Sequence, residues 1–272
     1  MLAQEIRFFF TAWTFFTRVP LPAALSGWVG YSEFLLNGAA RYFPLVGLFV
    51  GLVGAAVFTF CIWLFTPMVA VALAMAATVL MTGAFHEDGF ADVCDGFGGA
   101  HEPERVLAIM KDSRVGAFGA IGIALMLLTK FSALVSLAEA VDVELCGWIL
   151  LSGHTLSRAA PLALIRWMDY VRPDADARAK PMAQAVSAPG LALALFWGVL
   201  PVGALIYFYE NGWLLALGVI PVGLAAAALG AWFKRRIGGY TGDCLGATQQ
   251  LAEVVFYLYA LALLVQPAEG SV

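Results

Sequence analysis

The chain has 272 residues, of which 62% are hydrophobic and only 12% carry a charge. Soluble domains carry about 25% charged residues, so this composition excludes an ordinary soluble enzyme and indicates an integral membrane protein. The formal net charge of −4, together with the lack of a basic patch, argues against nucleic acid as a partner.

The first predicted element is an interfacial helix near the N-terminus. Residues 8–16 read FFFTAWTFF, which is too short to cross a bilayer and is rich in the aromatic side chains that favour the membrane–water interface. Arg18 follows without a small-residue cleavage site, so the pattern differs from a secretory signal peptide. The prolines of VPLP at 19–22 end this helix.

Seven further stretches are long and apolar enough to cross about 30 Å of hydrocarbon as helices. They are residues 44–65, 67–85, 117–138, 143–165, 191–209, 213–233 and 251–267. The sequence therefore predicts an all-α, polytopic helical bundle with about seven transmembrane helices. No internal repeat or low-complexity linker divides it, so we expect one domain that spans residues 1–272.

The basic residues are distributed unevenly between the two predicted sides of the membrane. With the N-terminus and the 83–116 loop placed in the cytoplasm, 13 of the 15 Lys and Arg lie on that side. They are Arg7, Arg18, Arg41, Arg105, Lys111, Arg114, Arg166, Arg172, Arg178, Lys180, Lys234, Arg235 and Arg236. The positive-inside rule then predicts a multi-pass protein of the inner (cytoplasmic) membrane, with an external C-terminus.

Acidic residues cluster directly after the second predicted span. Asp88, Asp92 and Asp95 are spaced i, i+4 and i+7, so they share one face of a helix, where they repel each other unless a cation neutralises them. Carboxylate oxygens suit Mg²⁺ or Mn²⁺, which also accept phosphate oxygens, and the neighbouring Glu87 can reach the same ion. The competing interpretation is a solvated acidic loop.

The string DVCDG at 92–96 is also similar to the start of the motif of membrane CDP-alcohol phosphotransferases, which use Mg²⁺ to cleave a nucleotide diphosphate. The downstream part of that motif does not follow here. The likeness therefore supports diphosphate chemistry at a metal rather than membership of that family. Gly89 and Gly96 in the same stretch allow another backbone or a ligand to approach closely.

A combination of strings resembles the adenosylcobinamide-GDP ribazoletransferase family, the cobalamin (5′-phosphate) synthases. The strings are FFTRVPLP (15–22), HEDGFADVCDGFGG (86–99), IMKDSRVGAFGA (109–120), GHTLSRAAP (153–161) and GGYTGDCLGATQQLAE (238–253), in the family's order. They are spread over almost the whole chain, from residue 15 to residue 253. One local departure is Gln249 and Gln250, where the family often carries an acidic residue.

The resemblance implies a Mg²⁺-dependent transferase of substituted phosphate groups, with Mn²⁺ as the alternative ion, that acts late in cobalamin (vitamin B12) biosynthesis. Such an enzyme transfers the phosphoryl-cobinamide group of adenosylcobinamide-GDP to α-ribazole, or to α-ribazole 5′-phosphate, and releases GMP. Expected partners are these substrates and the lipid bilayer, but no nucleic acid. The sequence leaves open whether other copies of the chain or other cobalamin-assembly enzymes bind.

The resemblance also implies roles for the acidic residues. Catalysis of phosphoryl transfer consists mainly of positioning and of neutralising charge on the diphosphate. The implied metal ligands are Glu87, Asp88, Asp92 and Asp95. One of the three aspartates, or the distant Asp243, would take the hydroxyl proton, and the sequence does not choose among them. For Asp243 the alternative is a helix N-cap.

Basic and polar residues are the expected substrate-binding groups. They are Lys111, Ser113, Arg114, Lys130, His154 and Arg158. Arg114 offers a bidentate fork to phosphate, and Asp112 either adds a ligand or orients Arg114. Lys130, His154 and Arg158 lie inside predicted spans, where ionisable residues are functional candidates, although a buried polar contact that holds the bundle together is the alternative.

Two other functional classes compete with this interpretation. A transporter would use the intramembrane ionisable residues as a substrate path, but no inverted repeat is visible. A CDP-alcohol-type membrane phosphotransferase is the nearest enzymatic alternative.

Overall fold

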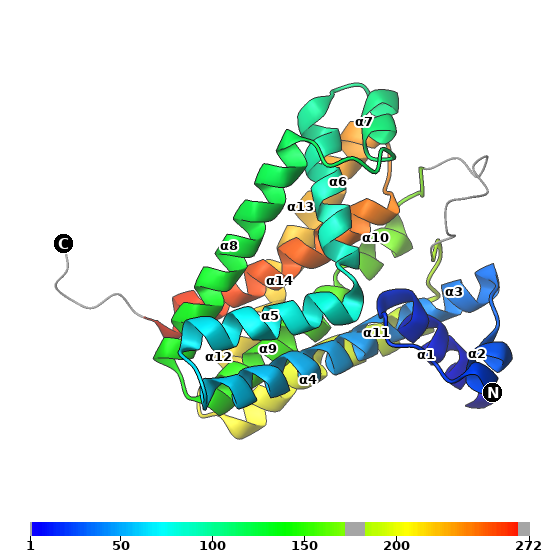
Figure 1. The fold of residues 1–272 in the computed structure, drawn as a ribbon. Helices are drawn as coiled ribbons and strands as arrows, with labels where there is room; N and C mark the ends of the chain where they lie inside the picture. The colour runs from blue at the N-terminus through cyan, green and yellow to red at the C-terminus, as the bar shows by residue number, and fades with distance from the viewer. Residues whose placement is uncertain (1, 172–182, 266–272) are drawn as a thin grey trace.

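The computed structural model is a bundle of helices and describes residues 2–171 and 183–265 (Figure 1). Within these ranges the only β-type pairing is an isolated bridge between Tyr170 and Tyr240. The helices are α1 (Leu2–Phe16), α2 (Ala23–Val29), α3 (Glu33–Ala39), η1 (Ala40–Tyr42), α4 (Phe43–Ile62), α5 (Pro67–Thr82), α6 (Phe85–Gly99), α7 (Pro103–Ile109), α8 (Ala117–Ala140), α9 (Val143–Ala159), α10 (Pro161–Trp167), α11 (Ala188–Phe208), α12 (Gly212–Ala216), α13 (Val219–Ile237) and α14 (Gly242–Leu264).

Several of these helices are long and apolar enough to cross a membrane. In the described part of the chain they are Glu33–Ile62, Ala117–Ala140, Ala188–Phe208, Gly212–Ile237 and Gly242–Leu264. Helices α5 and α6 form a sixth candidate only as a pair bent by 89°. The predicted helical membrane bundle is confirmed, whereas the count of seven spans stays a prediction. Arg172, Arg178 and Lys180 of the predicted cytoplasmic side lie outside the described residues.

The N-terminal segment packs against the bundle. The predicted helix is present as α1, and its Glu5 accepts hydrogen bonds from Arg41 Nη1 at 3.0 Å and from the Tyr42 hydroxyl at 2.9 Å. After α1, the backbone N–H of Arg18 donates to the Met81 carbonyl at 2.7 Å. The N-terminal segment therefore supports the end of α5, where the chain turns into α6.

Helix α9 lies at the centre of the bundle and packs against α4, α11 and α14. Every residue from Ile149 to Ala159 is buried. We predicted one continuous span over 143–165, but α9 ends at Ala159 and α10 begins at Pro161. The reason for the break is that proline has no backbone N–H to continue the helix.

The start of α14 is the clearest difference from the predicted spans. The predicted span began at residue 251, and residues 234–250 were assigned to a loop, but the helix begins at Gly242 with Thr241 as its N-cap. Thr248, Gln249 and Gln250 lower the hydropathy of this segment, yet all three are buried. Because their partners are other protein groups, polar residues can occupy this part of a transmembrane helix.

Candidate functional site

The predicted acidic helix is present as α6, which carries Glu87, Asp88, Asp92 and Asp95. Its start follows two residues with left-handed backbone, Gly83 (φ 68°) and Ala84 (φ 57°), at the 89° bend after α5. Glycine adopts this conformation without steric cost. The bend directs α6 away from α5 and along α8 and α14 (Figure 1).

Helices α6 and α14 meet at glycines on both sides. A Cβ atom on Gly89 would lie 3.0 Å from the Cα of Asp243, and one on Gly246 would lie 3.2 Å from the His86 carbonyl oxygen. The predicted close approach of another backbone to Gly89 is therefore confirmed. This α6–α14 crossing brings Asp243 next to the helix that carries Asp88 and Asp92, about 150 residues earlier in the chain.

Asp95 makes a structural contact with a neighbouring helix. Its two carboxylate oxygens accept hydrogen bonds from the backbone N–H groups of Gly116 and Gly119, both at 2.7 Å. These groups belong to the start of α8, whose first backbone N–H groups lack partners within the helix. Asp95 thus caps α8 from outside, and its assigned roles as metal ligand and base stay predictions.

The carboxylates near the α6–α14 crossing differ in their exposure to solvent. Asp88 is exposed, whereas Asp92 and Asp243 are half-buried. Among the described residues, no three His, Cys, Asp or Glu side chains gather closely enough to enclose a metal ion. Mg²⁺ is commonly held by one or two carboxylates together with water and substrate phosphates. The described carboxylates therefore form no all-protein cage, and the Mg²⁺ site stays a prediction.

Asp112 orients Arg114 in the loop between α7 and α8. Its carboxylate accepts from Arg114 Nη2 at 2.6 Å and Nε at 3.1 Å, and from the Arg114 backbone N–H at 3.1 Å. Hydrogen bonds from the guanidinium and then from the backbone N–H lower the pKa of Asp112 to about 2. Of the two interpretations of Asp112, the orienting contact is the one present. Lys111, Ser113 and Arg114 are all exposed.

Arg236 binds the far end of α6. Its Nη2 donates to the carbonyl oxygens of Ala100 at 2.6 Å and Phe97 at 3.2 Å, and its guanidinium lies 5.2 Å from the centroid of the Phe97 ring. These bonds satisfy carbonyls that the end of a helix leaves without partners. The Lys234–Arg236 triplet therefore does more than signal orientation.

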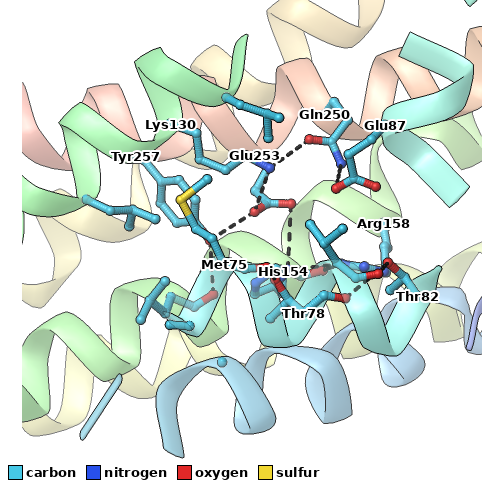
Figure 2. A pocket seen from close by; sticks show the side chains of 16 residues that line it. Met75, Thr78, Thr82, Glu87, Lys130, His154, Arg158, Gln250, Glu253 and Tyr257 are labelled. Carbon is cyan, nitrogen blue, oxygen red and sulfur yellow. Dashed lines mark hydrogen bonds and ion pairs between the residues drawn. The ribbon is translucent and has the colours of Figure 1, made fainter. Parts of the chain in front are cut away.

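Two of the three predicted intramembrane residues, Lys130 and His154, meet at Glu253, a residue to which we assigned no role, and Arg158 contacts His154 (Figure 2). Lys130 Nζ lies 3.2 Å from Glu253 Oε1, and His154 Nδ1 lies 3.6 Å from Glu253 Oε2. Arg158 Nη1 donates to the His154 carbonyl at 2.9 Å. All four residues are at most 6% exposed. Glu253 is itself ionisable and inside a predicted span, so the same rule could have found it.

Amide and hydroxyl groups extend this buried network. Gln249 Nε2 donates to Glu253 Oε2 at 2.7 Å and to Ser157 Oγ at 2.9 Å, and the Tyr257 hydroxyl donates to Glu253 Oε1 at 3.3 Å. The adjoining cavity measures about 20 Å³, which is room for about one water molecule. The described contacts therefore support the bundle-holding interpretation, and substrate binding by Lys130, His154 and Arg158 stays a prediction.

Comparison with known proteins identifies the family. The family model described as cobalamin-5-phosphate synthase matches residues 8–262. The chain belongs to this family. Three curated relatives are named adenosylcobinamide-GDP ribazoletransferase. They come from Leptothrix cholodnii (47% identity over 96% of this chain and 97% of the relative), Shewanella amazonensis (46%, over 96% of each) and Ralstonia pickettii (44%, over 96% and 97%). No solved structure matches the chain.

In this cobalamin-5-phosphate synthase family member, distant motif strings come together in space. Residues 86–99 form α6, 109–120 contain the Arg114 loop and the start of α8, and 238–253 lead into α14. The 153–161 string supplies Ser157, which bonds Gln249 of α14. We call this region, where α6 lies across the start of α8 and α14, the α6 end of the bundle.

Proposed function

We propose that the protein is an adenosylcobinamide-GDP ribazoletransferase. In this reaction a hydroxyl oxygen of α-ribazole, or of its 5′-phosphate, attacks the phosphorus that bears cobinamide. The bond from that phosphorus to GMP breaks, GMP leaves, and the hydroxyl proton passes to a base. The observation that carries the proposal is the family match over residues 8–262, whose strings at 86–99, 109–120 and 238–253 pack together through α6, α8 and α14.

The α6–α14 crossing provides the acidic part of the proposed site. Asp88, Asp92 and Asp243 are the ligands we propose for Mg²⁺, which would neutralise charge on the diphosphate. Asp92 and Asp243 are half-buried there, so one of them is the proposed base for the ribazole hydroxyl. Glu87 Oε1 accepts from Gln250 of α14, whereas its buried Oε2 has no hydrogen-bond partner, so Glu87 stays among the proposed metal ligands.

Arg114 provides the basic part of the proposed site. Because Asp112 holds its Nε and Nη2, the guanidinium plane is oriented, while the side chain remains 87% exposed. An oriented guanidinium matches the geometry of phosphate oxygens better than a mobile ammonium does. Its loop leads directly to the start of α8, which Asp95 binds to α6. We propose that Arg114 binds the diphosphate.

We further propose that the α6 end faces the cytoplasm from the inner membrane. The basic residues that lie at this end include Lys111, Arg114 and Arg236, as the positive-inside rule requires of cytoplasmic segments. A nucleotide-linked substrate then reaches the site from the cytoplasm.

The experiment that tests the function uses membranes from a host that lacks this activity. Membranes with and without the protein are incubated with adenosylcobinamide-GDP, α-ribazole and Mg²⁺, and corrinoid products are separated by chromatography. We expect adenosylcobalamin only with the protein, and its 5′-phosphate when α-ribazole 5′-phosphate is the acceptor. Identical products from both membranes would contradict the proposal.

A further inference from the structure

A line of hydrogen bonds connects the first turn of α6 to the buried network. Gln250 Nε2 of α14 donates to Glu87 Oε1 at 3.0 Å, and Lys130 Nζ of α8 donates to Gln250 Oε1 at 2.7 Å (Figure 2). Lys130 in turn pairs with Glu253 at 3.2 Å. Three helices are therefore joined through one amide side chain, which is 2% exposed.

The amide of Gln250 suits this place chemically. It must donate a hydrogen bond to a carboxylate on one side and accept one from an ammonium on the other, and a primary amide does both. A carboxylate at this position would accept from Lys130 but would repel Glu87. The network is also balanced in formal charge, because Lys130 and Arg158 face Glu87 and Glu253, and an added charge would disturb that balance.

Helix α6 depends on contacts such as this one at its start. No side chain caps its N-terminus, and it follows directly on the two left-handed residues at the bend. Farther along, Asp95 binds α8 and Arg236 binds the last turn. The hydrogen bond that Glu87 accepts from Gln250 thus holds the first turn of α6 in place, immediately before Asp88.

We propose that Gln250 is a positioning residue for the acidic face of α6. Lys130 holds the Gln250 amide, and the amide in turn fixes Glu87 in the first turn of α6. This contact sets the orientation of α6 and therefore the direction in which the Asp88 and Asp92 side chains point. The expected effect of Gln250 on turnover rests on the proposed function, whereas its expected effect on the position of α6 does not depend on any substrate. Glu87 serves as the attachment point of α6 in this arrangement.

The primary test is the variant Gln250→Glu, which keeps the size of the side chain and removes its donor. We expect kcat for ribazole transfer to fall about a hundredfold, the loss that a displacement of about 1 Å in a catalytic group can cause. KM should change less than kcat, because the proposed diphosphate-binding group Arg114 is held by Asp112 and not by Gln250. Gln4→Glu makes the same chemical change on the exposed face of α1 and should leave kcat and KM unchanged.

A second readout reports α6 directly. Cys94 of α6 is half-buried against Gly122 of α8, whereas Cys61, Cys146 and Cys244 are buried. A water-soluble maleimide should label Cys94 faster in Gln250→Glu than in the native protein. Gln250→Met removes these two hydrogen bonds, and the one from Gln250 Nε2 to Gln249 Oε1 at 2.9 Å, without adding charge. It should give faster labelling too and covers the case in which Gln250→Glu does not fold.

The decisive variant exchanges the two side chains. Glu87→Gln combined with Gln250→Glu puts the donor on α6 and the carboxylate on α14. The hydrogen bonds to α6 and to Lys130 and the charge balance can then re-form, whereas the bond to Gln249 Oε1 is not restored. We expect this pair to restore slow Cys94 labelling and most of kcat relative to Gln250→Glu. If Glu87 were needed as a carboxylate for a metal ion, the exchange would restore labelling but not kcat, and the positioning account of turnover would be overturned.

The remaining outcomes separate this inference from the proposed function. Native labelling rates in folded Gln250→Glu and Gln250→Met would overturn the positioning role, whatever the activity. If the native protein formed no cobalamin while labelling followed the expected order, the attachment of α6 would stand and the ribazoletransferase proposal would fail.

Discussion

Thr241, two positions before Asp243, decides whether Asp243 is the N-cap of α14. The place of Asp243 before a run that enters the membrane is typical of a helix N-cap, but the cap of α14 is Thr241, whose Oγ1 accepts from the Cys244 N–H at 3.4 Å. The N-cap interpretation of Asp243 is therefore wrong. Its backbone packs on Gly89 instead, which places the residue at the α6–α14 crossing.

We predict that Asp243→Asn remains folded and inserted but loses at least about a hundredfold in turnover, the size expected for a lost proton acceptor. Ser187→Ala, which removes the N-cap of α11, is the matched control, because loss of a cap costs about 1 kcal/mol of stability and should spare turnover in protein that still folds. Activity is measured as cobalamin formed per folded protein. Native turnover in Asp243→Asn would remove this residue from the site.

Asp112 supports a second prediction at this scale. Its low pKa, about 2, means that the carboxylate stays ionised and its contribution is lost only as the pH falls through that value. The pair with Arg114 should therefore persist across neutral pH. We expect Asp112→Asn to raise KM for adenosylcobinamide-GDP more than it lowers kcat, with no new ionisation in the profile of KM between pH 6 and 9, as judged from steady-state kinetics. An unchanged KM would show that the orientation of Arg114 is irrelevant.

At the scale of elements, α6 is held by groups that come from far along the chain. The helical spacing of its acids and the close approach at Gly89 could be predicted locally. The partners of Glu87 and Asp95 could not, because Gln250 is 163 positions away and the N–H groups that Asp95 caps become visible only when α8 lies beside it. The start of α14 was predicted wrongly for a related reason. The buried Gln249 and Gln250 lower the hydropathy of this segment, and low hydropathy is typical of a loop outside the membrane.

This arrangement predicts different effects for two acids of the same helix face. Asp95→Asn replaces one acceptor oxygen with a donor that faces a backbone N–H, so it should lower stability by about 1.5–3 kcal/mol. Asp88→Asn, at an exposed position, should leave stability unchanged and lower turnover, with partial recovery at higher Mg²⁺. Thermal unfolding in detergent and cobalamin formation measure the two effects. Equal stability of both variants would contradict the capping contact.

The pair of Lys130 and Glu253 joins α8 to α14 and allows a further test. Lys130→Met should destabilise the protein by about 3–5 kcal/mol, because it leaves a buried carboxylate without its cation. Adding Glu253→Gln should recover part of this loss, because it removes the unpaired buried charge and keeps an amide oxygen that can accept from Gln249 or Tyr257. Thermal unfolding of both variants provides the comparison, and a double variant less stable than Lys130→Met would contradict the assignment.

At the scale of the whole molecule, the distribution of charge predicts how the bundle lies in the membrane. Reporter domains fused after residue 100, next to the end of α6, should read cytoplasmic, and reporters fused after residue 272 should read external if the chain has seven spans. A cytoplasmic C-terminus would instead favour the six candidates that length and apolar composition allow, with α5 and α6 as one bent span.

The central claim is that this membrane bundle transfers phosphoryl-cobinamide to ribazole at its α6 end. The most direct measurement uses the purified protein in liposomes with adenosylcobinamide-GDP and Mg²⁺, and follows GMP and corrinoid product together. We predict equal amounts of GMP and adenosylcobalamin, with neither formed when α-ribazole is omitted or the metal is chelated. GMP release that proceeds without α-ribazole, or no release at all from folded protein, would contradict the account.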